Sequence, residues 1–233
     1  MKQLILKNTY RPSQAMSDVY RRIRTNIVFS GVENKVICFT GCEAGEGKSL
    51  VTFALAKTFA ENGSRVLLID ADLRNSYLYE QFGVSHEATG LAHFLSGLSV
   101  LEDCIYSTNI EGVCLIPSGA VCPNSTELLG KRQMKQLIAS VRKVFDYVLI
   151  DTPPLGLLVD AAIVASQSDA SILIVDASHN RRRTVSMVQK QLIEMNPNFL
   201  GIILNKVEDT SHRYGERYGY GYGYGYGYGN FKD

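Results

Sequence analysis

Residues 36–49, VICFTGCEAGEGKS, decide the fold, because they join an apolar run to a glycine-rich turn and then to a lysine and a serine. The apolar, β-branched run predicts a buried strand, and residues 50–60 (LVTFALAKTFA) predict an amphipathic helix. Gly45 and Gly47 allow the backbone to turn sharply and to approach a ligand closely. The helix that begins near Lys48 directs its positive end at the same place. The stretch therefore predicts a loop that binds phosphate groups.

This loop departs at one position from the usual phosphate-loop pattern, G-x-x-x-x-G-K-[ST]. Gly47, Lys48 and Ser49 match the pattern, but Cys42 stands in the place of the first glycine and Gly41 lies one residue early. A chance glycine-rich turn is the alternative interpretation. The strand predicted before the loop and the helix predicted after it count against that alternative.

The composition is that of one α/β domain with a tail. The chain has 233 residues, of which 45% are hydrophobic, enough for one sizeable core but not comfortably for two. Five cysteines include no C-x-x-C pair, so we expect neither a disulfide framework nor a zinc site. The net charge of +1 conceals a basic N-terminal arm. No apolar run approaches the ~18 residues of a membrane-spanning helix, so we expect that the chain does not cross a membrane by itself.

Two further strands are predicted to end in carboxylates. The stretch RVLLIDADLR reads as a buried parallel strand that finishes in Asp70, Asp72 and Arg74, and DYVLIDTPP reads as another that finishes in Asp151. Open α/β sheets bind their ligands at the carboxyl ends of the strands, so these acids are candidate ligand-binding residues. Asp151 fits the Walker B arrangement, in which a strand-end carboxylate holds Mg²⁺ or its water. A helix cap is the alternative role for Asp151.

The rest of the chain alternates between helical and strand periodicity, which predicts a doubly wound, mostly parallel α/β sheet flanked by helices. These elements are a helix at 13–30, a short strand at 113–119, a helix at 125–143 capped by Asn124, a strand at 170–178, a helix at 181–195 and a strand at 200–208. Asn205, at the end of the last strand, is a candidate contact for the nucleotide base. A turn or cap residue is its alternative role.

The C-terminal segment has a different character from the core. From Tyr214 to Tyr228 the chain is almost entirely glycine and tyrosine. Glycine has the largest ordering cost and no aliphatic residue contributes burial, so we expect a disordered tail. A linker or an adhesive aromatic tract is the alternative to a functional substrate.

Taken together, these features resemble the bacterial tyrosine kinases of capsule and exopolysaccharide synthesis. The resemblance rests on AGEGKS, LLIDADLR, VLIDTPP and the terminal tyrosine cluster, and it covers nearly the whole chain. It is nearest to the soluble kinases of Gram-positive bacteria, of the CpsD and CapB type. It implies a P-loop NTPase fold with an arm and oligomerisation helix at 1–35, a kinase domain at 36–210 and a tyrosine-rich tail at 211–233.

The resemblance implies ATP and Mg²⁺ as cofactors and assigns a role to each motif residue. Lys48 would neutralise the β- and γ-phosphates, and Ser49 and Asp151 would hold the metal. Asp70 would act as the base and Asp72 as a metal contact, although the sequence leaves open which of the two is the base. The implied nucleotide-binding residues are Glu43, Ala44, Gly45, Glu46, Gly47, Lys48, Ser49, Leu50 and Asn205.

The resemblance also implies partners. The family's oligomerisation motif, E-x-x-R-x-x-R, falls on Asp18, Arg21 and Arg24, with Asp in place of Glu, and an ordinary solvated helix face is the alternative. We expect a homo-oligomeric ring, an octamer by resemblance, and a tyrosine phosphatase partner. We also expect a transmembrane adaptor of the polysaccharide co-polymerase type, which recruits the cytoplasmic chain to the inner face of the plasma membrane, and no nucleic-acid partner. Phosphorylation is expected on Tyr218, Tyr220, Tyr222, Tyr224, Tyr226 and Tyr228.

The expected function is ATP-dependent phosphorylation of these tail tyrosines in trans, which regulates capsular polysaccharide synthesis and export. One alternative is a positioning ATPase of the MinD and ParA type. Another is a non-catalytic assembly factor that binds ATP only to oligomerise. Positioning ATPases carry a signature lysine at the position that Glu43 occupies in this chain, and its absence counts against that alternative.

Overall fold

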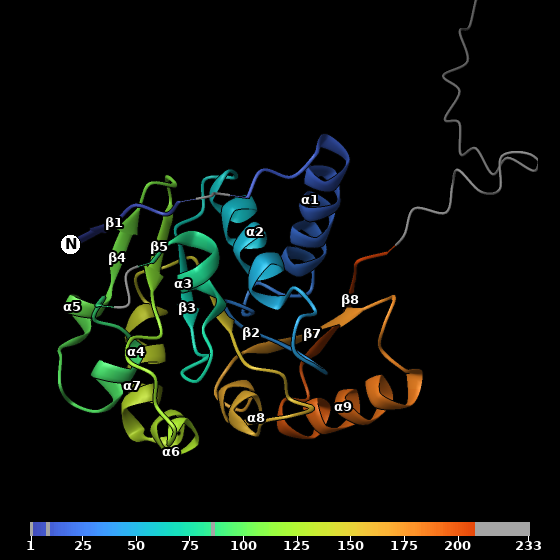
Figure 1. Ribbon diagram of the computed structural model, residues 1–233. Coiled ribbons are helices and arrows are strands. Elements are labelled where there is room, and N and C mark those ends of the chain that lie inside the picture. Colours follow the sequence, from blue (N-terminus) through green and yellow to red (C-terminus); the bar gives the residue numbers. More distant parts are fainter. Residues whose placement is uncertain (1, 8–9, 85–86, 208–233) are drawn as a thin grey trace, which may run out of the picture.

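The computed structural model describes residues 2–7, 10–84 and 87–207. Within them, one sheet of eight strands has the spatial order β1-β4-β5-β3-β6-β2-β7-β8 (Figure 1). Its strands are β1 (Lys2–Leu4), β2 (Val36–Gly41), β3 (Val66–Asp70), β4 (Tyr106–Thr108), β5 (Val113–Ile116), β6 (Tyr147–Asp151), β7 (Ala170–Asp176) and β8 (Phe199–Asn205). Among the described strands, every neighbouring pair is parallel except β4 and β5. The predicted mostly parallel sheet is confirmed.

Helices cover both faces of this sheet (Figure 1). One face carries α1 (Gln14–Phe29), α2 (Lys48–Ala60) and α3 (Tyr77–Phe82). The other face carries α4 (Leu91–Leu95), α5 (Leu101–Cys104), α6 (Ser125–Gly130), α7 (Arg132–Val141), α8 (Asp160–Ala165) and α9 (Arg182–Met195). The chain is therefore doubly wound, as its alternating pattern predicts.

The central strand β2 shows why the sheet needs helices on both sides. All six of its residues are buried. Val36 and Cys38 belong to the apolar core on the α8 side, whereas Ile37 and Phe39 belong to the core on the α2 side. Successive side chains of a strand point to opposite faces, so a continuous apolar run is stable only when both faces are covered.

The helix that follows the phosphate loop differs from the amphipathic helix that the sequence predicts. In α2, nine of the thirteen residues are buried, and they lie all around the helix rather than on one stripe. The reason is that α1 packs on its outer side, where Arg24 donates a hydrogen bond to the Thr58 carbonyl at 3.1 Å. A helix enclosed between the sheet and a second helix buries residues on every side.

The single helix predicted at 125–143 is wrong, because the structure has two helices there. Lys131 separates α6 from α7 with an extended backbone, ψ 157°, and its ammonium group donates to the Leu95 carbonyl at 3.4 Å. Gly130, immediately before it, has a low helix propensity. Asn124 occupies the predicted cap position before α6, but its side chain makes no capping hydrogen bond.

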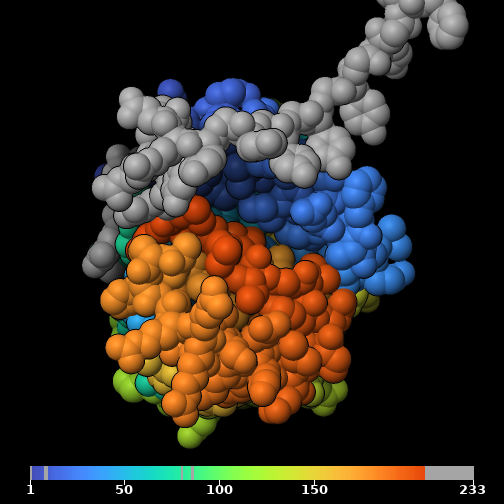
Figure 2. Space-filling model, turned by 90° about the vertical axis from the view of Figure 1, so that its right-hand side faces the viewer, coloured from blue at the N-terminus to red at the C-terminus, as the bar shows by residue number. Residues whose placement is uncertain are grey.

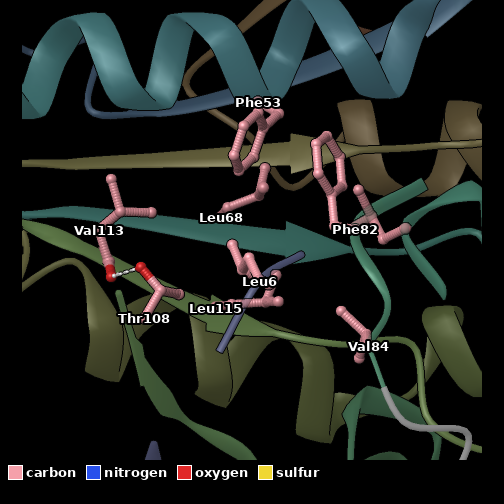
Figure 3. A pocket seen from close by; sticks show the side chains of 9 residues that line it. Leu6, Phe53, Leu68, Phe82, Val84, Thr108, Val113 and Leu115 are labelled. Atoms are coloured by element: carbon pink, nitrogen blue, oxygen red, sulfur yellow. Dashed lines mark hydrogen bonds between the residues drawn. The ribbon is translucent and has the colours of Figure 1, made fainter. Parts of the chain in front are cut away.

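The first residues of the chain contribute a strand that the sequence pattern does not indicate. β1 pairs with β4, and the next residues place Leu6 in a narrow apolar pocket between α2, α3 and the sheet. Figure 3 shows the Leu6 side chain directed toward Leu68, Leu115 and Phe82. Two backbone contacts hold this segment, since the Leu6 amide donates to Asn109 at 2.9 Å and the Lys7 amide donates to the Phe82 carbonyl at 2.7 Å.

The chain reverses its winding at the centre of the sheet. From β2 the chain passes through α2 to β3, on one side, and from β6 it passes through α8 to β7, on the other side of β2. Ligands of open α/β sheets bind at such a switch point, outside the carboxyl ends of the strands. The loop after β2 lies at this position.

β1 forms one edge of the sheet and β8 the other, and β8 is followed in the chain by residues 208–233. Figure 2 shows this side of the molecule, where β8 and α9 (orange to red) lie beside α1 (blue). Ile202 and Leu204 of β8 are partly exposed there. In the described part of the chain, no helix is long and apolar enough to span a membrane.

Candidate functional site

The loop between β2 and α2 contains two glycines whose backbone conformation other residues rarely adopt. Gly45 and Gly47 both have positive φ angles, 79° and 82°, a conformation that strains other residues. A Cβ atom on Gly47 would also lie 2.4 Å from the Asn205 amide nitrogen. These two features explain why glycine is needed at this position, which immediately precedes the first turn of α2.

Lys48 is the cation of this loop. Its side chain is buried, and its ammonium nitrogen lies 3.3 Å from the Glu43 carbonyl oxygen, so the side chain folds back over the loop that precedes it. A single weak bond to a carbonyl leaves most of the donor capacity of an ammonium group for a phosphate. This arrangement can neutralise a phosphate group held by the loop.

Glu46 is an unusual residue for such a loop, because its carboxyl group is buried. Burial raises its pKa, and this effect is opposed by the nearby Glu43 and Cys42 amides, the Lys48 charge and the Asn180 side chain. The side chain fills the space beside Gly41, where a Cβ atom would lie 1.9 Å from a Glu46 carboxylate oxygen. Glu46 therefore forms part of the inner wall of the loop.

Two carboxylates face each other at the ends of neighbouring strands. Asp70 of β3 and Asp151 of β6 are register partners, and both are buried. Burial raises the pKa of Asp151 to about 7, and burial together with the charge of Asp151 raises the pKa of Asp70 well above its usual range. Such a pair favours a cation between or beside its members. The neighbouring Ser49 hydroxyl works in the opposite direction and lowers the pKa of Asp151.

Asp72 lies in a tight turn that the acids themselves organise. The Asp72 amide donates to Asp70 at 3.1 Å, and the Arg74 and Asn75 amides donate to Asp72 at 3.2 and 2.9 Å. The hydroxyl of Ser76 donates to the other oxygen of Asp70. Asp70 and Asp72 are thus both oriented by the turn that follows β3.

The donor set fits Mg²⁺ in one respect. The Oδ1 atom of Asp151 is buried and accepts no hydrogen bond within the described chain. A buried carboxylate oxygen without a partner is costly, and a cation would satisfy it. Across the described ranges no group of three or more His, Cys, Asp or Glu side chains is arranged to hold a metal alone. Mg²⁺ usually takes one or two carboxylates together with substrate phosphates and water, so this donor set suits it.

The end of β8 is tied to the phosphate loop. The Asn205 amide donates to the Glu46 carbonyl at 2.8 Å, and the Lys206 ammonium donates to the Gly45 carbonyl at 2.7 Å. Lys206 also pairs with Asp176 at 2.8 Å, which holds the pKa of that carboxyl well below its usual range. Asn205 therefore lies beside the phosphate loop.

The structure places the remaining predicted residues in different environments. Ala44 is exposed on the loop, whereas the Leu50 side chain packs against the core on the α2 side, so only its backbone faces the loop. Asp18 and Arg21 form an exposed pair at 2.8 Å on α1. Arg24 is turned onto α2 by its bond to Thr58, so the expected exposed row of three charges is shortened. The six predicted phosphorylation sites lie outside the described residues.

Several residues at the site are absent from the sequence-based prediction. Asp176 ends a strand at the same edge as Asp70 and Asp151, and that placement could have indicated it. Ser76 and Lys206 lie in the segments after β3 and β8, and no sequence motif indicates either of them. Asp160, buried at the start of α8, accepts bonds from side chains of two other segments, and nothing in its local sequence indicates this.

Comparison with known proteins places this site in a family. A family model described as an AAA domain matches residues 34–199. Tyrosine-protein kinase CpsD of Streptococcus agalactiae is 41% identical over 215 residues, which cover 92% of this chain and 93% of that protein. The solved kinase domain of the Escherichia coli tyrosine kinase ETK superposes with a TM-score of 0.79 at 35% identity, over 88% of this chain and 80% of that one.

The full-length Escherichia coli relative is longer than this chain. It is 35% identical over 198 residues, which make up 84% of this chain but 27% of the relative. The septum site-determining protein MinD of Pyrococcus horikoshii, complexed with Mg-ADP, is a more distant likeness. Its TM-score is 0.59 at 31% identity, over 73% of this chain and 69% of that one.

Proposed function

Because the chain belongs to the family of bacterial tyrosine-protein kinases, we propose that it transfers the γ-phosphoryl group of ATP to tyrosine residues of its own C-terminal segment. The observation that carries this proposal is the meeting of a phosphate loop with the buried acid pair Asp70 and Asp151 at the switch point of the sheet. Phosphoryl transfer needs charge neutralisation and positioning more than covalent help, and this arrangement supplies both.

Each residue of the site has a role in this proposal. The backbone amides of residues 43–47 and the N-terminus of α2 bind the phosphates, and Lys48 neutralises the β- and γ-phosphates. Asn205 contacts the base from the end of β8. Ser49, Asp72 and Asp151 are the residues that would hold Mg²⁺. When bound, Mg²⁺ neutralises charge on the phosphate oxygens.

Asp70 is the proposed base. The tyrosine oxygen forms a bond to the γ-phosphorus as the bond to the β-phosphate oxygen breaks, ADP leaves, and the phenolic proton passes to a carboxylate. A free tyrosine hydroxyl has a pKa near 10, so it benefits from a neighbouring base whose own pKa is raised toward neutrality. The raised pKa of Asp70 supports that assignment.

The cellular setting is proposed from the same family membership. The chain acts at the cytoplasmic face of the plasma membrane, recruited by a transmembrane adaptor, and its phosphorylation state regulates capsular or exopolysaccharide synthesis. A tyrosine phosphatase reverses the reaction, and the charged face of α1 at Asp18, Arg21 and Arg24 takes part in a homo-oligomeric ring, by family an octamer.

The proposal is tested by incubating the purified chain, with and without a peptide from its adaptor, with labelled ATP and Mg²⁺. Phosphoamino-acid analysis then separates the possibilities. A tyrosine kinase yields phosphotyrosine, a positioning ATPase yields free phosphate only, and an assembly factor yields neither. Lys48→Met is the matched control, in which phosphotyrosine should disappear while the fold remains intact.

A further inference from the structure

A closed network of side chains joins three segments beside the site. The carboxylate of Asp160, at the start of α8, is fully buried. It accepts hydrogen bonds from the hydroxyls of Ser125 and Thr126, the first residues of α6, one on each of its oxygens. Arg74, which follows the acidic turn after β3, donates to the same two hydroxyls at 2.8 and 3.4 Å and lies 3.4 Å from the carboxylate itself.

The direction of each hydrogen bond in this network is fixed by Asp160. A hydroxyl group has one proton, and an ionised carboxylate can only accept. Ser125 and Thr126 therefore direct their protons to Asp160 and leave their lone pairs for the guanidinium group of Arg74. Without the carboxylate, Arg74 would lose one direct acceptor, and the two hydroxyls that accept from it would lose the group that orients them.

Arg74 is in turn part of the turn that carries the acids. Its own amide donates to Asp72, and the Asp72 amide donates to Asp70. The side chain of Arg74 thus fixes one end of a short turn whose other end is the last residue of β3. A guanidinium group held at a fixed position restricts how far that turn can move.

Asp160 is itself fixed relative to the phosphate loop. The segment that joins β6 to α8 is bound to the end of β2, because the Leu155 amide donates to the Gly41 carbonyl at 2.9 Å and the Thr40 hydroxyl donates to the Pro153 carbonyl at 2.9 Å. A Cβ atom on Gly156 would lie 2.2 Å from the Cys42 carbonyl, so this segment packs directly on the loop. Asp160 therefore connects the phosphate loop with the acidic turn.

From these contacts we propose that Asp160 is a positioning residue for phosphoryl transfer, which acts through Arg74 to hold Asp70 and Asp72 in register with the phosphate loop. This inference rests on the proposed function of the site. Misplacing a reacting group by about 1 Å can cost on the order of 100-fold in rate, so a residue that touches no substrate can still determine kcat.

The test compares two aspartates that are each paired with an arginine. Asp160→Asn disrupts the network beside the site. Asp169→Asn is the matched control, because Asp169 pairs with Arg142 at 2.6 Å and accepts from the Val36 amide at 2.8 Å at the amino ends of the strands, away from the acids. For each purified full chain, the measurements are kcat and KM for ATP-dependent tyrosine phosphorylation, the Kd of a fluorescent ATP analogue, and urea unfolding.

For Asp160→Asn we expect kcat to fall about tenfold or more, with the nucleotide Kd changed less than about threefold, because the phosphate loop keeps its own contacts. Asp169→Asn should keep the wild-type kcat even where its stability falls. The Arg74→Ala and Asp160→Asn losses should not multiply in the double variant, because both act through one contact. A wild-type kcat in Asp160→Asn, or losses that multiply, would overturn the proposal.

A second readout separates this inference from the proposed activity. Amide hydrogen exchange of Asp72, Arg74 and Asn75 in the nucleotide-free chain should accelerate in Asp160→Asn and remain unchanged in Asp169→Asn. Should Asp160→Asn not fold, Thr126→Val removes one arm of the network and takes its place in both measurements. Absence of phosphotyrosine in the wild type would refute the proposed function, whereas unchanged exchange of the turn would refute the positioning role.

Discussion

Asp151 is a carboxyl group that the nucleotide-free protein keeps protonated over part of the neutral range. Burial raises its pKa to about 7 in the folded chain, whereas the pKa of an aspartate in an unfolded chain is about 3.9. Between these two values the folded state holds a proton that the unfolded state has released. The contribution of Asp151 to stability is therefore fully present at low pH and is lost as the pH rises from about 4 to about 7.

Asp151→Asn should abolish the loss of stability that the ionisation of Asp151 causes between about pH 4 and pH 7. Without nucleotide and divalent cation, we expect the free energy of unfolding of the variant to exceed that of the wild type by roughly 2–4 kcal/mol at pH 8, and the two to converge near pH 4. Urea titrations at several pH values measure the difference. Asp146, whose pKa is lowered by its hydrogen bonds to Arg65, serves as a control, because Asp146→Asn should have the opposite sign above pH 4. A constant difference between wild type and Asp151→Asn at all pH values would refute this account.

At the level of elements, β1 and the residues after it close one side of the core. The Leu6 side chain is buried among Phe53, Phe82 and Leu115, where Figure 3 shows these side chains directed at one another. Leu6→Ala should lower the free energy of unfolding by roughly 2–4 kcal/mol, because it removes buried methyl groups and leaves a cavity. Ile5→Ala is the matched control, since Ile5 is 68% exposed and its truncation should cost less than about 0.5 kcal/mol. Equal losses in the two variants would mean that the first strand is not packed in this way.

The sequence predicts the elements that carry their own periodicity and misses those that depend on distant contacts. The strands at Val36–Gly41 and Tyr147–Asp151 are apolar runs, long enough to be identified alone. β1 has three residues, and it becomes a strand only because it meets β4 across about 100 residues of chain. At the break between α6 and α7, Gly130 is a local signal, but the bond from Lys131 to Leu95 is a distant contact that the sequence does not indicate.

The same distinction applies to the site. The phosphate loop, Asp70 and Asp151 are indicated by strand ends and glycine spacing, because their chemistry is local to a turn. Arg74 belongs to a motif, but its partner Asp160 lies 86 residues away and is recognised only when α6 and α8 are packed together. Buried polar partners from different elements cannot be paired from one sequence, because many polar residues fit the pattern equally well.

Lys206 connects the last strand to the phosphate loop, and its loss should weaken the binding of ATP. Lys206→Met keeps the aliphatic stem but removes the bonds to the Gly45 carbonyl and to Asp176. We expect the Kd for ATP to rise about three- to tenfold, the effect of one ordinary hydrogen bond, and the amides of residues 43–47 to exchange faster. Lys190→Met, on the exposed side of α9, is the control and should leave both unchanged. Unaltered nucleotide affinity in Lys206→Met would show that the loop does not depend on this tether.

At the level of the whole molecule, we expect one chain to phosphorylate another. An extended segment of about 14 residues, from Thr210 to Tyr224, would span on the order of 45 Å, which is enough to reach a neighbouring site. A Lys48→Met chain with an intact tail, mixed with an active chain that lacks residues 211–233, should become phosphorylated on tyrosine. Absence of label on the Lys48→Met chain would indicate transfer within one chain.

Phosphorylation should also weaken the assembly that promotes it. Each phosphotyrosine adds about −1.5 to −2 charges near neutral pH, so several on one tail bring roughly ten negative charges. The Asp18 and Arg21 pair on α1 is exposed, and exposed ion pairs contribute little to stability. Native mass spectrometry after incubation with Mg-ATP and adaptor should find the wild type as monomer and Lys48→Met as oligomer. Equal oligomer populations in the two chains would contradict this cycle.

The central claim is that the phosphate loop and the two strand-end acids transfer phosphate to tyrosine, and site-resolved mass spectrometry of the tail tests it most directly. After incubation of the wild type with Mg-ATP and adaptor peptide, the account predicts phosphate on tyrosines between Tyr218 and Tyr228, and none in Lys48→Met or Asp151→Asn. A wild-type chain that converts ATP to ADP while these tyrosines stay unmodified, or a Lys48→Met chain phosphorylated as fully as the wild type when incubated alone, would contradict it.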